Sequence, residues 1–117
     1  MANSTELMIY RKTVTLYEHC YPMIIKFPQA EKFALSQELK LAFYHLLKSI
    51  VLANEIRHKR RLYQDEIEGQ LGLLIVLLDL AKRRGYITKK SSLFIQSKLE
   101  EIGRMLGGWI KATERMK

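Results

Sequence analysis

The C-terminal segment carries mostly apolar residues at alternating steps of four and three, and this repeat most constrains the fold. It runs through Ile95, Leu99, Ile102, Leu106, Trp109, Thr113 and Met116. Such spacing places all of these side chains on one face of an α-helix. The repeat therefore predicts a long helix that buries one side.

Three glycines, Gly103, Gly107 and Gly108, interrupt the same repeat. Gly in a helix interior costs roughly 1 kcal/mol relative to Ala, so the segment must recover stability elsewhere. Gly103 and Gly107 lie one turn apart on a shared face, where the missing side chains let another backbone approach. We therefore expect close packing at Gly103, Gly107 and Trp109.

Three earlier segments show the same helical period. The first carries Leu7, Tyr10, Val14, Tyr17, Tyr21 and Ile24. The second carries Leu35, Leu39, Ala42, Leu46, Ile50 and Ala53. The third carries Tyr63, Ile67, Leu71, Leu74, Leu78 and Ala81. With the C-terminal segment, the chain is expected to form four helices.

Breaker and capping residues mark the expected helix ends. Pro22 is expected to kink or end the first helix, and Pro28 suits the first turn of the second. Gly85 follows three cations, which is typical of a helix C-terminus. Thr88 is the expected cap of the fourth helix.

The chain has 117 residues, enough for one domain with a single core. It has no alternating apolar run and no hairpin turn signal, so no β-strand is predicted. Short connections favour antiparallel neighbours. We predict one all-α domain over residues 1–117, an antiparallel up-down-up-down four-helix bundle some 30–40 Å long.

The third helix has more apolar residues than one buried stripe requires. Residues 71–81 are apolar except for Gly72 and Asp79. A bundle helix buries one stripe and exposes a polar face, and an apolar patch left in water marks an interaction surface. We expect a self-association interface, with a thick monomeric core as the alternative. The interface residues would be Leu73, Val76, Leu77 and Leu80.

The formal net charge is +8, which favours acidic partners such as nucleic acid. One cation cluster lies in the expected turn between the second and third helices, and another follows the third helix. We expect phosphate contacts at the second cluster, whereas the first could equally be neutralised by Asp65, Glu66 and Glu68. The candidate residues are Arg57, Lys59, Arg60, Arg61, Lys82, Arg83, Arg84, Lys89 and Lys90.

The sequence argues against catalysis and against a metal or cofactor. The three histidines have no metal-ligand spacing, and no phosphate-binding or nucleophile motif is present. The single cysteine, Cys20, is expected to be a packing residue. Stacked bases are not expected, because most aromatic residues fall on the predicted core stripes rather than between surface cations.

The expected location is the cytoplasm, without a membrane association. The first residues show no basic start and no apolar core of a signal peptide. The longest apolar run, residues 71–78, is far shorter than the ~20 residues that span a bilayer.

Three segments carry a family resemblance. The Phe27-Pro28 to Leu35 region resembles the four-helix bundles that include proteins encoded in ribosomal-RNA intervening sequences. The segments Leu46–Asn54 and Glu100–Lys111 are similar to a sister group, the accessory variability determinant proteins of diversity-generating retroelements. The Glu101–Ile110 stretch is the most specific part of this likeness.

The resemblance implies a homopentameric barrel of four-helix bundles with a basic surface for nucleic acid. It also implies a partnership with the reverse transcriptase of the retroelement, in which the two proteins together copy template RNA into mutagenised cDNA. The accessory protein is not the catalyst. The runner-up hypothesis is an oligomeric interaction scaffold that does not bind nucleic acid.

One departure from the family pattern concerns the middle of the third helix. Family members often place two arginines there, one turn apart. This chain has Ile75 and Asp79 at the matching positions. If those arginines serve RNA, the cation clusters at the bundle ends would have to replace them.

Overall fold

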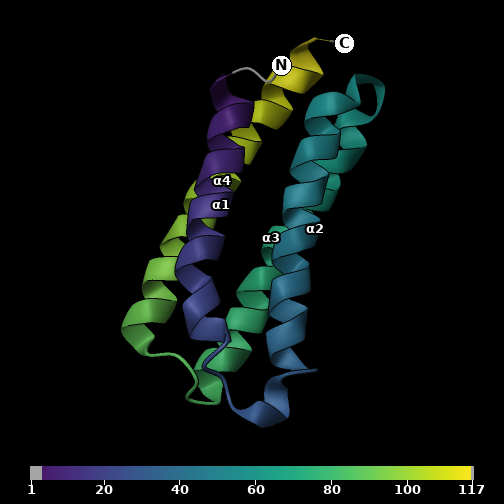
Figure 1. Ribbon diagram of the computed structural model, residues 1–117. Coiled ribbons are helices and arrows are strands. Elements are labelled where there is room, and N and C mark those ends of the chain that lie inside the picture. Colours follow the sequence, from purple (N-terminus) through teal and green to yellow (C-terminus); the bar gives the residue numbers. More distant parts are fainter. Residues whose placement is uncertain (1–3, 117) are drawn as a thin grey trace.

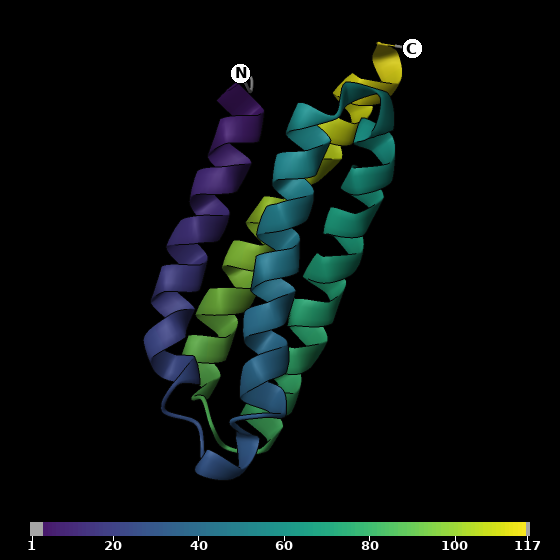
Figure 2. The same cartoon turned by 45° about the vertical axis from the view of Figure 1, so that its right-hand side comes forward.

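Four helices lie side by side in the computed structural model and alternate in direction along the chain (Figures 1 and 2). The structure describes residues 4–116, with side chains from residue 8 onward. The helices are α1 (Ser4–Ile24), α2 (Leu35–Glu55), α3 (Arg60–Arg83) and α4 (Lys89–Arg115). Two short 3-10 turns precede α2 and α3, namely η1 (Gln29–Glu31) and η2 (Arg57–Lys59). No strand occurs within residues 4–116, so the predicted all-α bundle is confirmed.

The up-down-up-down order sorts the loops between the two ends of the bundle. The described ends of the chain and the α2–α3 turn lie at one end, which we call the terminal end (Figure 1). The α1–α2 and α3–α4 connections lie at the other, which we call the loop end. The bundle extends 47 Å along its longest axis, beyond the expected 30–40 Å. The longest helix, α4 with 27 residues, accounts for about 40 Å of this length at 1.5 Å per residue.

The core stripes of α2, α3 and α4 follow the sequence pattern closely. All six positions predicted for α2 are buried, as are five of the six for α3, with Tyr63 partly buried. In α4 the first five positions through Trp109 are buried, whereas Thr113 is intermediate and Met116, just past the end of the helix, is exposed. These three faces are confirmed.

The predicted face of α1 is confirmed at Tyr17 and Ile24 and is wrong at Tyr10 and Tyr21. The buried residues are Ile9, Thr13, Leu16, Tyr17, Cys20 and Ile24. Tyr10 and Tyr21 are exposed instead, and the side chain of Leu7 lies outside the described part. The true stripe is rotated by about a quarter turn from the predicted one, given 100° per residue. Tyr10 and Tyr21 keep their hydroxyls near water, whereas the hydroxyl of the buried Tyr17 donates to that of Tyr44 at 3.1 Å.

Two polar side chains inside the core, Thr13 and Gln64, each donate a hydrogen bond, and the Gln64 side-chain oxygen has no partner among the described residues. The Thr13 hydroxyl donates to the carbonyl oxygen of Ile9 at 2.8 Å, so its burial leaves no free donor. The Gln64 amide nitrogen donates to the Thr113 hydroxyl at 2.9 Å and joins α3 to α4. Cys20 is a buried free thiol whose pKa burial raises to about 12, which confirms its packing role.

The predicted helix ends are confirmed for α3 and α4. Gly85 has φ +77°, the left-handed conformation that closes a helix, and the Tyr86 amide donates back to the Ala81 carbonyl. The Thr88 hydroxyl accepts from the Ser91 amide at 3.0 Å and caps α4. Pro22, in contrast, does not end α1, which continues to Ile24.

Within the described residues, no helix contains a segment apolar and long enough to cross a lipid bilayer.

Candidate nucleic-acid interface

The four cations of the first cluster meet at the terminal end of the bundle. Arg57 and Lys59 belong to η2, and Arg60 and Arg61 begin α3. All four line a cavity of about 470 Å³, which Thr113 and Met116 border from the end of α4. The fold therefore gathers the predicted cluster around one concave surface.

Arg60 has a structural role within this cluster. Its guanidinium donates to the carbonyl oxygens of Ala53 at 2.7 Å and Asn54 at 2.9 Å, in the last turn of α2. The same group lies 5.9 Å from the ring centre of Trp109. Arg60 thus caps α2 with a side chain and joins three helices. These bonds engage its guanidinium within the bundle, although Arg60 also lines the cavity.

Arg61 is held by two carboxylates, Asp65 at 2.5 Å and Glu114 at 3.2 Å. Arg57 and Lys59 are exposed and form no ion pair within the described residues. Of this cluster, Arg57 and Lys59 are therefore the side chains best placed to contact phosphate.

The second cluster lies at the loop end, where α3 finishes and α4 begins (Figure 2). Arg83 pairs with Asp79 at 2.7 Å, and this hydrogen bond lowers the pKa of the Asp79 carboxyl. Lys82, Lys89 and Lys90 are exposed and have no ion pair among residues 8–116. The lysines are thus the available cations at this end.

Arg84 belongs to a small polar network around Glu31. One Glu31 oxygen accepts from Arg84 at 3.1 Å and from the Tyr86 hydroxyl at 2.7 Å. The other accepts from the amide of Leu35, the first residue of α2, at 3.4 Å. The hydrogen bond from Tyr86 lowers the pKa of Glu31, with further contributions from Leu35 and Arg84. The network ties the α1–α2 connection to the α3–α4 connection.

Only some of the additional apolar residues of α3 lie on the surface. Leu73, Val76 and Leu80 are exposed, with Val76 at 56%, and they form a stripe opposite the core. Leu77 is 9% exposed and belongs to the core, so its assignment to the interface is corrected. Leu77 lies on the same side of α3 as Glu66, whose carboxylate accepts a hydrogen bond from Ser49 of α2. The outer stripe is therefore narrower than predicted.

Gly103 and Gly107 do not mediate close packing within the chain. A Cβ atom built on either glycine would meet no heavy atom within 4 Å, so the predicted role is wrong for the single chain. The two glycines instead line an open groove of about 270 Å³ between α3 and α4, which Ile75 also borders. Trp109 is buried as expected. The missing side chains create a surface hollow rather than a tight helix contact.

The expectation that most aromatic residues lie on the core stripes rather than between surface cations fails at two phenylalanines, Phe94 and Phe33. Phe94 of α4 is 44% exposed, and the Lys98 ammonium lies 5.5 Å from its ring centre. Phe33, before α2, is 80% exposed and has Lys32 at the same distance. The i to i+4 spacing of Phe94 and Lys98 was a signal for this pairing.

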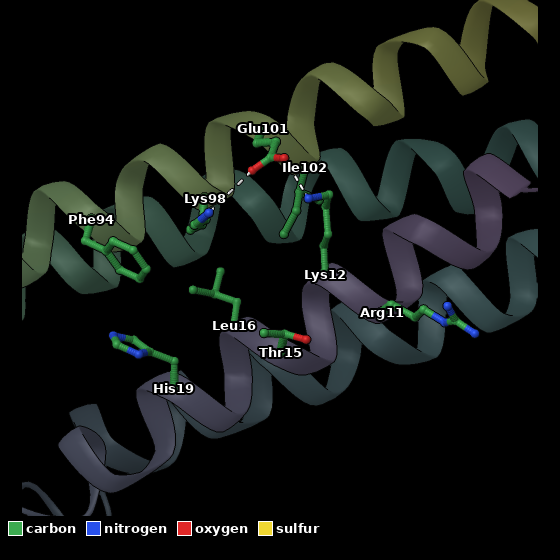
Figure 3. A pocket seen from close by; sticks show the side chains of 9 residues that line it. All are labelled: Arg11, Lys12, Thr15, Leu16, His19, Phe94, Lys98, Glu101 and Ile102. Carbon is green, nitrogen blue, oxygen red and sulfur yellow. Dashed lines mark ion pairs between the residues drawn. The ribbon is translucent and has the colours of Figure 1, made fainter.

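Phe94 and Lys98 also border a cavity of about 290 Å³ between α1 and α4, which is not among the predicted sites (Figure 3). Arg11, Thr15 and His19 recur every four residues, so they share one side of α1. The antiparallel pairing then brings His19 to Phe94, with ring centres 4.9 Å apart. That pairing is a tertiary fact and is not visible in either helix alone.

No cluster of three or more His, Cys, Asp or Glu side chains suited to a metal ion occurs in the described part of the chain.

The fold and its surface define a class: a basic four-helix bundle with exposed cations at both ends and an apolar stripe on one outer helix. The sequence model of the bAvd-like family matches residues 7–113, so the chain belongs to this family. The resemblance found in the sequence is thereby confirmed. A comparison with curated proteins gives no match.

Proposed function

We propose that this chain is a non-enzymatic accessory protein of a diversity-generating retroelement. It binds the reverse transcriptase and the template RNA and supports mutagenic cDNA synthesis. The family membership over residues 7–113 is the single observation that carries this proposal. The exposed cations at the two bundle ends and the net charge of +8 support it.

The phosphate contacts in this proposal come from five side chains that have no ion pair among the described residues. They are Arg57, Lys59, Lys82, Lys89 and Lys90. Clustered cations bind polyanions by releasing condensed counterions, without reading base sequence. Arg60, Arg61, Arg83 and Arg84 shape the ends and contribute to the electrostatic field.

A filter-binding titration tests the nucleic-acid claim. Affinity for a single-stranded RNA should fall steeply with salt, with a logarithmic slope of about −0.7 per phosphate contacted. Five contacts would give a slope near −3.5, by the same relation. A flat salt response would remove the nucleic-acid part of the proposal.

Self-association is the second part of the proposal, and the family resemblance implies five copies. Leu73, Val76 and Leu80 supply an apolar stripe that one bundle leaves in water. The adjacent α3–α4 groove with Gly103 and Gly107 offers room for a neighbouring side chain. Light scattering on the purified protein measures the number of copies.

The variant Val76→Glu should dissociate the oligomer, because a charge buried in an apolar interface is not compensated. Phe33→Glu is the matched control, since Phe33 is an exposed apolar residue away from α3. A monomer in the unchanged protein would overturn self-association.

The competing function is an oligomeric scaffold that does not bind nucleic acid. The specific observation in its favour is the replacement of the usual mid-α3 arginines by Ile75 and Asp79, of which Asp79 pairs with Arg83. Genomic neighbourhood separates the two functions. A reverse transcriptase gene beside a template repeat favours the retroelement role, and its absence favours the scaffold.

A further inference from the structure

The cavity between α1 and α4 combines an apolar floor with a charged rim (Figure 3). Leu16 and Ile102 form the floor, and the rings of His19 and Phe94 close one end. Its volume of about 290 Å³ lies at the small end of the range typical of ligand pockets. The ligand that fits is therefore small and partly apolar.

The aromatic end is suited to a planar ring. The His19 and Phe94 rings are tilted by 49° with centres 4.9 Å apart, so they form an open wedge rather than a closed stack. Phe94 remains 44% exposed, although burial would stabilise it. Lys98 lies 5.5 Å from the centre of that ring. An accessible aromatic face beside a cation is the arrangement with which proteins stack an unpaired base next to its phosphate.

The rim favours an anion. It holds Arg11, Lys12 and Lys98 against the single acid Glu101. Lys12 contacts one oxygen of Glu101 at 2.7 Å, and Lys98 lies 3.9 Å from the other. Because two cations neutralise this carboxylate, the rim keeps a net positive charge. Arg11, which is exposed and has no ion pair within the described residues, adds a free guanidinium.

The aromatic rings and the two cations of α1 lie at different ends of the cavity. The rings lie at one end, whereas Lys12 and Arg11 lie toward the other (Figure 3). We propose that this cavity binds one nucleotide unit, with the base against Phe94 beside His19 and the phosphate at Arg11, next to the Lys12–Glu101 ion pair. The unit is a free mononucleotide or an unpaired nucleotide of RNA or DNA, and in the second case the inference rests on the proposed function. A paired base does not fit, because its faces are already stacked.

The ring signals of His19 provide a direct test by NMR. The chain has three histidines, and His45 and His58 lie outside this cavity, so they are internal controls. The variant His19→Gln identifies the His19 signal. At constant pH, AMP should shift the His19 signal through its ring current and leave those of His45 and His58 unchanged. Adenosine and ribose 5-phosphate, which each lack one half of the nucleotide, should produce smaller shifts at the same concentration.

Two aromatic variants measure the stacking. Phe94→Ala should weaken AMP binding by about 5- to 150-fold, the range expected for one stacked base. Phe33→Ala removes an equally cation-flanked phenylalanine outside the cavity and should leave AMP binding unchanged. Circular dichroism verifies that both variants remain helical. Equal affinity of Phe94→Ala and the unchanged protein, or an equal His19 shift with inorganic phosphate, would overturn the proposal.

Oligonucleotides separate this inference from the proposed function. A single-stranded ten-residue oligo(U) should reproduce the His19 shift, and its duplex with oligo(A) should not. Oligo(U) binding that leaves the His19 signal in place would overturn the oligonucleotide part of the pocket assignment, while the proposed nucleic-acid binding at the bundle ends would stand. An AMP-dependent shift without any oligo(U) binding would support a mononucleotide pocket and remove nucleic-acid binding.

Discussion

The two ends of the bundle close a helix in different ways. At the terminal end, α2 stops where the Arg60 guanidinium donates to the carbonyls of Ala53 and Asn54. At the loop end, α3 stops at Gly85, whose left-handed backbone allows the Tyr86 amide to reach the Ala81 carbonyl. One end uses a cationic side chain as its cap, whereas the other uses the backbone.

This difference decides which cations remain available. The side-chain cap engages Arg60, and nearby acids engage Arg61, so the terminal end keeps Arg57 and Lys59. The backbone cap requires no cation, and residues 82–90 contain no acid. The planar guanidinium suits fixed, multidentate bonds, whereas the flexible ammonium stays solvated. The loop end is therefore expected to contribute more to polyanion binding.

The largest expected effect comes from reversing charges at the loop end. The triple variant Lys82→Glu, Lys89→Glu and Lys90→Glu should lower the logarithmic salt slope for single-stranded RNA by about 2, at roughly 0.7 per lost contact. The double variant Arg57→Glu and Lys59→Glu should lower it by about 1.4. Filter binding over a range of salt concentrations measures both slopes. A larger decrease of the salt slope in the double variant would show that the terminal end, rather than the loop end, contributes more to RNA binding.

Removal of the side-chain cap should be the largest single effect on stability. Arg60→Ala leaves two carbonyls of α2 without their partner and is expected to lower the free energy of unfolding by about 2 kcal/mol. Arg60→Lys should recover only part of this loss, because the lysine ammonium does not reproduce the planar guanidinium that donates to both carbonyl oxygens. Lys59→Ala, an exposed neighbour, should stay within about 0.5 kcal/mol. Urea unfolding measures all three, and equal stability of Arg60→Ala and Lys59→Ala would remove the capping role.

Substitution of the backbone cap gives a smaller effect. Gly85→Ala forces a Cβ into the left-handed conformation and should cost about 1 kcal/mol. Gly103→Ala makes the same chemical change inside a helix, where the new Cβ meets no atom within 4 Å. It should stabilise the bundle by about 0.5–1 kcal/mol. Thermal unfolding tests the opposite signs when both changes are made in the Val76→Glu variant, which is expected to be monomeric. A stabilising Gly85→Ala would contradict the backbone cap.

Helical periodicity was enough to predict the fold, but not the surface. In α2 the repeat of Leu35, Leu39 and their successors is buried as predicted, although Leu41, Tyr44 and Val51 of the same helix are exposed. In α1 a tyrosine stripe and an aliphatic stripe compete, and only packing against the other helices selects Ile9 and Leu16 for the core. Apolar patterning is ambiguous wherever amphipathic aromatics are frequent.

The partners of the cations were equally hard to predict from the sequence. The local Asp79–Arg83 pair has i to i+4 spacing and is visible in the sequence. The contacts Arg84–Glu31 and Arg61–Glu114 join residues 53 positions apart and depend on the bundle register. The cavity at Phe94 likewise requires α1 and α4 together. Sequence placed the cations at the ends, and the fold decided which of them stay free.

The Glu31 network should make the loop end the more acid-sensitive of the two. Its contacts lower the pKa of Glu31 below the ordinary value of 4.5, so its contribution to stability is complete above that value. This contribution is lost as the pH falls through the lower pKa of the folded state. Glu31→Gln should therefore reduce the Tm at pH 7, and the difference from the unchanged protein should shrink as the pH falls below 4.5. Thermal melts of both proteins from pH 7 to pH 3 measure this convergence, with Glu38→Gln, an exposed position on α2, as the control. A difference that stays constant with pH would show that the carboxylate charge does not hold the two loop-end connections together.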